Sequence, residues 1–68
     1  MAEINIRVGK NIRKYREKKG WSQEQLAFEC KLHRTYIGHI ERAEKNIGLA
    51  NLEKIAKSLK VKISKLIE

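Results

Sequence analysis

Hydrophobic and polar residues follow one another along the 68-residue chain at helical spacing. Val8, Ile12 and Tyr15 fall at positions i, i+4 and i+7, which predicts the buried stripe of a helix over residues 6–18. Residues 1–5 precede this helix as an expected irregular lead-in. Gly20 is a typical helix-ending residue, and Trp21 is expected to fill the gap between this helix and the next one.

Two shorter helices are predicted next, over residues 23–30 and 34–42, with a break at residues 31–33. Ser22 is a favourable N-cap residue and Gln25 follows three places later, so the pair predicts a reciprocal capping box. Both helices have an apolar face, formed by Leu26, Ala27, Cys30, Ile37 and Ile40.

The C-terminal part predicts a polar loop over residues 43–47 and two further helices. The helix after Gly48 is expected to face the core with Leu49, Leu52, Ile55, Ala56 and Leu59. After a break at Val61, Ser64 is expected to cap a last helical turn, with Ile63 as a hydrophobic staple. Four apolar residues lie near the C-terminus: Leu59, Ile63, Leu66 and Ile67. They have two interpretations of equal weight, because they either close the core over the first helix or form a homodimer interface.

These patterns predict an all-α fold: one compact domain over residues 1–68, with five short helices around a single core. The segment 49–67 then serves the core and a dimer interface. Cys30 is the only cysteine, so no intrachain disulfide forms, and its place on an inward face indicates a small core residue. No apolar run approaches the ~20 residues that cross a bilayer, and the first ten residues lack a signal peptide's apolar region. We therefore expect a cytoplasmic protein.

The net charge of the chain narrows the range of possible binding partners. The chain has 16 Lys and Arg against 8 Asp and Glu, a formal net charge of +8 with a pI near 9.9. Such an excess favours a polyanionic partner, either nucleic acid or an anionic membrane surface, and the helical pattern favours nucleic acid over membrane. His33 and His39 lie six residues apart on different faces without further ligands, so we expect no metal, no cofactor and no enzymatic activity.

The predicted helix over residues 34–42 has a continuous outward stripe. Its members stand at i, i+1, i+4, i+5 and i+8: Arg34, Thr35, Gly38, His39 and Arg42. A basic, hydrogen-bonding stripe with a small residue at its centre suits the major groove of DNA. Double-stranded DNA is therefore the expected partner.

The order of these features resembles the lambda-repressor/Cro-like helix-turn-helix proteins, the XRE family, over nearly the whole chain. The resemblance rests on Gly9, Ile12 and Arg16, on the run GWSQEQLA over residues 20–27, and on Tyr36–Ile37, Ile40–Glu41–Arg42, Leu52, Ile55–Ala56, Leu59 and Val61. Within the family, HRTYI at 33–37, followed by Glu41–Arg42 and Lys45–Asn46, looks like the controller proteins of restriction–modification systems.

The resemblance implies a helix-turn-helix over about 22–42 and a role for each matching residue. Three side chains would face base edges: Arg34, Thr35 and His39. Five would contact the sugar–phosphate backbone: Gln23, Tyr36, Arg42, Lys45 and Asn46. Arg16 and Glu41 would form an ion pair between the first and third helices. Lys31 and Ala43 stand where the family usually has glycine, and Lys31 would then adopt a left-handed conformation.

The resemblance also implies a homodimer on a near-palindromic operator. A dimer bound upstream of a promoter would recruit RNA polymerase, whereas a dimer bound over the promoter would block the polymerase. The sequence leaves both modes of regulation open. The alternative is an antitoxin-type DNA-binding module that also binds a protein partner.

Overall fold

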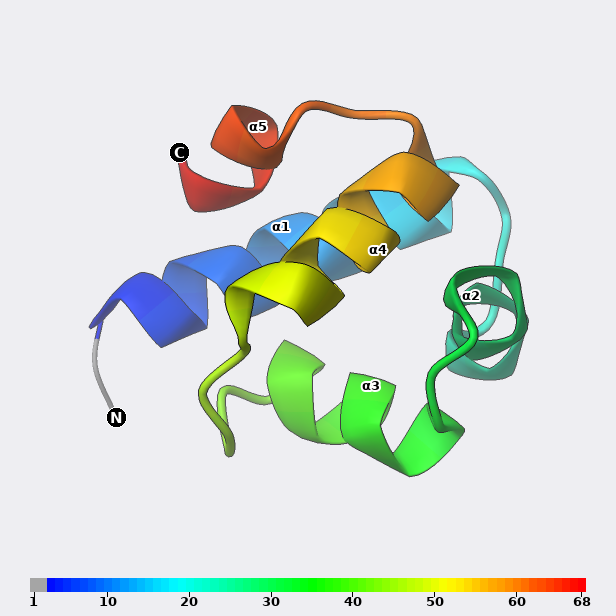
Figure 1. Cartoon of the computed structure of the whole chain (residues 1–68), viewed down its shortest axis with the longest axis horizontal. Coiled ribbons are helices and arrows are strands. Elements are labelled where there is room, and N and C mark those ends of the chain that lie inside the picture. Colours follow the sequence, from blue (N-terminus) through cyan, green and yellow to red (C-terminus); the bar gives the residue numbers. More distant parts are fainter. Residues whose placement is uncertain (1–2) are drawn as a thin grey trace.

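The longest helix is α1 (Glu3–Lys18), and it packs mainly against the third and fifth helices of the chain. It is followed by α2 (Gln23–Cys30), α3 (Arg34–Glu41), α4 (Leu49–Leu59) and α5 (Ile63–Ile67). The computed structural model describes residues 3–68, and within them every regular element is a helix. The predicted all-α fold of five helices is confirmed (Figure 1).

The start of α1 differs from the prediction. The helix begins at Glu3 rather than near residue 6, and Glu3 forms an exposed i, i+4 ion pair with Arg7 at 3.3 Å in its first turns. An acidic residue at a helix N-terminus also interacts favourably with the helix dipole. The predicted lead-in was therefore wrong for residues 3–5, and residues 1 and 2 lie outside the described part of the chain.

The cap of α2 forms as predicted on one side only. Ser22 Oγ accepts a hydrogen bond from the Gln25 backbone N–H at 3.0 Å. In the reciprocal bond of a capping box, the Ser22 backbone N–H would donate to Gln25 Oε1. The Gln25 side chain instead points along α2, where its Nε2 donates to Glu29 Oε2 at 2.8 Å. The predicted capping box is thus half correct.

Helices α1 to α4 end in the same way within the described residues. A residue with positive φ closes each helix: Gly20 at 73°, and Lys31, Ala43 and Lys60 at 60°. The following residue donates its N–H to a carbonyl five positions back, in the pairs Trp21–Arg16, Leu32–Ala27, Glu44–His39 and Val61–Ala56. This is the Schellman motif, and it confirms the left-handed conformation expected for Lys31.

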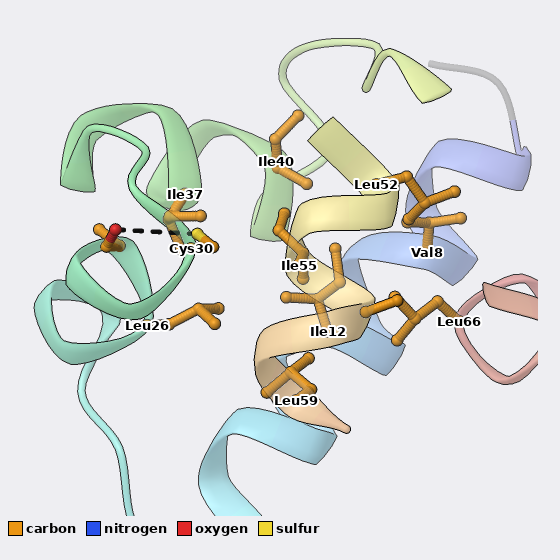
Figure 2. Close-up of a cluster of buried hydrophobic side chains, with 12 residues drawn as sticks. Val8, Ile12, Leu26, Cys30, Ile37, Ile40, Leu52, Ile55, Leu59 and Leu66 are labelled. Atoms are coloured by element: carbon orange, nitrogen blue, oxygen red, sulfur yellow. Dashed lines mark hydrogen bonds between the residues drawn. The ribbon is translucent and has the colours of Figure 1, made fainter. Parts of the chain in front are cut away.

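One contiguous core lies between the helices. Ile12, Leu26, Ile37, Ile55 and Leu66 are fully buried within it, one from each helix (Figure 2). Cys30 is also buried, as predicted, and burial raises the pKa of its thiol. The predicted inward position of Leu49 was wrong, because this residue is 80% exposed. Helical periodicity gives the direction of a side chain but not whether a neighbour stands opposite it.

The C-terminal helix closes the core over α1. Leu59 and Leu66 are buried in the core, so they are not surplus apolar surface. α5 begins at Ile63, with Lys62 as its N-cap, so the expected Ser64 cap with Ile63 as a staple was wrong. Asn11 on α1 donates through Nδ2 to the Leu66 and Glu68 carbonyls at 2.9 and 2.8 Å, which satisfies the free end of α5. Ile67 remains 37% exposed.

Candidate nucleic-acid interface

The outward face of α3 carries polar side chains directly opposite its buried residues. Ile37 and Ile40 are buried, whereas Arg34 and Thr35 are exposed at the start of the helix. The N-terminus of α3 is capped by His33, whose Nδ1 accepts from the Thr35 backbone N–H at 3.0 Å. Core packing and capping together set which face of α3 is presented to solvent. α3 lies along one edge of the molecule in Figure 1.

An open groove of about 630 Å³ separates the N-terminal part of α2 from this face of α3. It is lined by Arg16, Ser22, Gln23, Glu24, Arg34, Thr35, Gly38 and Arg42. Four of the sequence-predicted contact residues therefore meet in one place: Gln23, Arg34, Thr35 and Arg42. The first-turn N–H groups of a helix such as α2 form a favourable environment for a phosphate.

Arg34 forms a weak internal contact at the mouth of this groove. Its Nη1 lies 3.3 Å from Glu24 Oε2, and the two side chains are 68% and 74% exposed. An exposed pair of this kind is worth ~0–1 kcal/mol. The guanidinium is therefore free to exchange Glu24 for another acceptor at little cost.

Gly38 sits at the floor of the groove. A Cβ built at this position would lie 3.1 Å from Arg42 Nη1 and 3.4 Å from Gln23 Oε1. The missing side chain thus leaves space for the side chains of Arg42 and Gln23 above α3. Close approach of DNA to the Gly38 backbone stays a prediction.

A buried ion pair ties α3 to α1 beneath the groove. Arg16 donates through Nε and Nη2 to the two carboxylate oxygens of Glu41 at 2.7 and 3.0 Å. Arg16 Nη1 also donates to the Trp21 carbonyl at 2.7 Å. The hydrogen bonds to Glu41 raise the pKa of Arg16, outweighing the opposite effect of burial. The pair therefore fixes the position of α3 relative to α1.

Gln23 belongs to the same network. Its Nε2 donates to Glu41 Oε1 at 3.0 Å, so the amide of the expected phosphate-contacting residue already has an internal acceptor. To reach a phosphate through Nε2, Gln23 must share this hydrogen bond or release it.

The remaining predicted contact residues lie at the C-terminal half of α3 and in the loop after it. Tyr36 is half-buried, and its hydroxyl accepts from Asn51 Nδ2 of α4 at 3.1 Å. Lys45 and Asn46 are exposed in the loop, outside the groove. The Asn46 side chain accepts a hydrogen bond from Asn5 of α1. These residues extend the predicted contact surface beyond the groove towards α4.

One residue of this surface was not singled out from the sequence. Glu44 contacts two of the predicted DNA-contacting side chains, with Oε1 2.7 Å from His39 Nδ1 and Oε2 3.1 Å from Arg42 Nε. The hydrogen bond from Arg42, and then that from His39, lower the pKa of the Glu44 carboxyl. Its signal in the sequence was an acidic residue in a basic segment, shortly after α3.

Residues 3–68 offer neither a group of metal ligands nor a membrane-spanning helix. These residues contain no cluster of three or more His, Cys, Asp or Glu side chains arranged to hold a metal ion. None of the helices described there is long and apolar enough to span a membrane.

Comparison with known proteins places the chain in a family. A sequence model of the helix-turn-helix family HTH_3 matches residues 12–66. The control protein C.BamHI of Bacillus amyloliquefaciens is 51% identical over 66 residues, which cover 96% of this chain and 82% of that protein.

Two solved structures share the fold. The restriction-modification controller protein C.AhdI from Aeromonas hydrophila has a TM-score of 0.88 and 39% identity, covering 91% of this chain and 94% of that one. The biofilm regulator SinR, solved in complex with DNA, has a TM-score of 0.86 and 32% identity, covering 90% of this chain and 98% of that one. The chain therefore belongs to the helix-turn-helix family HTH_3, and it is a DNA-binding transcriptional regulator of the restriction–modification controller type.

Proposed function

We propose that two copies of this protein bind a near-palindromic operator, each placing α3 in a major groove. The two recognition helices would then lie ~34 Å apart, one turn of DNA. The observation that carries this proposal is the groove in which exposed Arg34 and Thr35 face the N-terminus of α2. Base-reading and phosphate-binding groups thereby share one surface. The net charge of +8 adds a general attraction to DNA.

The exposed stripe supports a division of roles. Arg34 is long and basic enough to contact guanine O6 and N7 bidentately, a contact worth ~1–3 kcal/mol of discrimination. Thr35 offers a methyl group to thymine or a hydroxyl to a base, and His39 reads a base one turn further along α3. The sugar–phosphate backbone is held by Gln23, Tyr36, Arg42, Lys45 and Asn46. Lys45 and Arg42 contribute most of their effect through charge.

The dimer interface is assigned to the surface of residues 49–67. Leu49 and Ile67 are apolar and exposed there, which supports a contact between copies. Through such a dimer the protein would regulate a restriction–modification operon. It would recruit RNA polymerase from an upstream operator and block it from an overlapping one. It acts in the cytoplasm of a bacterium, on bacterial, phage or plasmid DNA, by binding rather than by catalysis.

Selection of bound duplexes from a random pool, followed by footprinting of the winner, tests this function. We expect an enriched inverted repeat, protection on both half-sites and two chains per duplex in light scattering. Enrichment without symmetry would overturn the dimer. A pool without any enrichment would reduce the interaction to non-specific attraction between charges.

A further inference from the structure

The end of α3 differs from the ends of α1, α2 and α4 in the residue that follows the positive-φ residue. At the ends of α1, α2 and α4, the residue that donates back across the Schellman motif is Trp21, Leu32 or Val61. All three pack against the core, as this motif usually requires. At the end of α3, the same position holds the exposed Glu44. An anionic side chain therefore replaces the usual apolar one beside the recognition helix.

The backbone of this motif brings Glu44 and His39 together. The Glu44 N–H donates to the His39 carbonyl at 2.8 Å, and Ala43, with φ of 60°, makes the turn. The Glu44 carboxylate then lies 2.7 Å from His39 Nδ1. Its second oxygen lies 3.1 Å from Arg42 Nε. One carboxylate oxygen thus contacts His39 and the other contacts Arg42, so the carboxylate is held in place.

The position of the Glu44 carboxylate determines which ring nitrogen of His39 carries the proton. Arg42 and His39 lower the pKa of Glu44, so the carboxyl is ionised at neutral pH and only accepts hydrogen bonds. The His39 Nδ1 must therefore carry the proton in this contact. The other ring nitrogen, Nε2, has no hydrogen-bond partner among residues 3–68, and the side chain is 33% exposed.

We infer that Glu44 is a positioning residue that sets the tautomer of His39 and, through it, the base that His39 selects. This inference rests on the proposed DNA-binding function. With Nδ1–H directed at Glu44, the neutral ring presents Nε2 as a hydrogen-bond acceptor. In the major groove, an acceptor matches the exocyclic amino group of adenine or cytosine. Guanine and thymine offer acceptors at the corresponding edge, so they are disfavoured at this position.

His33 provides an internal comparison for this assignment. Its Nδ1 accepts from the Thr35 backbone N–H at 3.0 Å, so in the neutral ring the proton must lie on Nε2. The two histidines of the chain are therefore expected in opposite tautomers. Any method that reports the protonation of each ring nitrogen distinguishes them within a single sample.

The first experiment uses long-range ¹⁵N–¹H spectra of the full chain without DNA, at about pH 8, where a free imidazole is neutral. We expect His39 with its proton on Nδ1 and His33 with its proton on Nε2. Glu44→Ala should shift His39 towards Nε2–H and leave His33 unchanged. Glu17→Ala is the matched control, because it removes the same charge from an exposed pair with Arg13, also at 3.1 Å. A wild-type His39 ring protonated on Nε2, alone or together with Nδ1, overturns the inference.

The second experiment selects duplexes from one random pool with four proteins in parallel: wild type, Glu44→Ala, His39→Ala and Glu17→Ala. At one position of each half-site, the wild type should prefer adenine or cytosine ~5–10-fold, the value of one hydrogen bond. Glu44→Ala and His39→Ala should both lose this preference, at the same position, while Glu17→Ala retains it.

The outcomes separate the two proposals. The positioning role is wrong if Glu44→Ala keeps the base preference that His39→Ala loses. It is also wrong if the two variants lose base preferences at different positions. In both cases the protein still binds its operator. If the wild type enriches no sequence, the proposed operator binding fails, while the spectra still decide the tautomer. An unchanged His33 signal in every variant shows that the fold at the start of α3 is intact.

Discussion

Arg16 on α1 and Glu41 in the last turn of α3 join through two parallel hydrogen bonds of 2.7 and 3.0 Å. The Arg16 side chain is 10% exposed and that of Glu41 only 3%. Because Gln23 also donates to Glu41, this one carboxylate connects three helices. The orientation of the recognition helix therefore depends on a polar contact as well as on the core.

Removing Arg16 should destabilise the fold strongly. Arg16→Ala leaves the Glu41 carboxylate buried without its cation, and we expect a loss of ~3–5 kcal/mol in the free energy of unfolding. Urea denaturation followed by circular dichroism measures this loss. Arg13→Ala is the control, because its pair with Glu17 is exposed and should cost at most ~1 kcal/mol. Equal losses for the two variants would contradict the structural role of Arg16.

Gly9 should be intolerant of even one methyl group. A Cβ at Gly9 would lie 2.6 Å from the Ile40 carbonyl oxygen and 2.8 Å from that of Glu41, so α1 and α3 would have to separate. We expect Gly9→Ala to lower the unfolding free energy by ~1–3 kcal/mol, despite the better helix propensity of alanine. Thermal melts test this expectation. Gly48→Ala meets open space and should change stability by less than ~1 kcal/mol, so the comparison isolates the close helix approach.

Arg34→Ala should affect recognition but not folding. We expect operator affinity to fall by ~1–3 kcal/mol, because a bidentate base contact is lost. The thermal melt should hardly move, since the contact of Arg34 with Glu24 is exposed. Fluorescence anisotropy with operator and random duplexes separates the effects. An equal loss on random DNA would assign Arg34 to phosphate contacts instead.

Lys45→Ala should weaken binding to every sequence alike. Lys45 is exposed in the loop after α3, and a phosphate contact carries no sequence information. The slope of log affinity against log salt should fall by about one unit, because one fewer counterion is released. Titrations at several salt concentrations provide the slope. An unchanged slope would remove Lys45 from the DNA-contacting set.

The helices themselves were largely predictable because their signals are local. The bounds of α2 matched the prediction, and α3 ends at Glu41, one residue before the predicted end. The inward faces of Leu26, Ile37 and Ile55 follow from helical spacing, and they are buried as expected. Errors came where a distant partner decided the outcome. Asn11 holds the end of α5, and Leu49 finds no neighbour to cover it.

The features of the candidate site also separate into those set by local sequence and those set by tertiary contacts. The sequence by itself determined two short helices joined by a tight break and the basic outward stripe of the second helix, because spacing along a helix fixes which side chains share a face. The DNA contacts expected of Gln23, Tyr36, Lys45 and Asn46 came instead from the resemblance to the XRE family. Only the tertiary structure decided which groups those side chains meet. It placed the Gln23 amide on the Glu41 carboxylate that also binds Arg16, and it placed Glu44 between His39 and Arg42. Such contacts depend on how helices pack and how the chain turns between them, and no local pattern of residues encodes those distances.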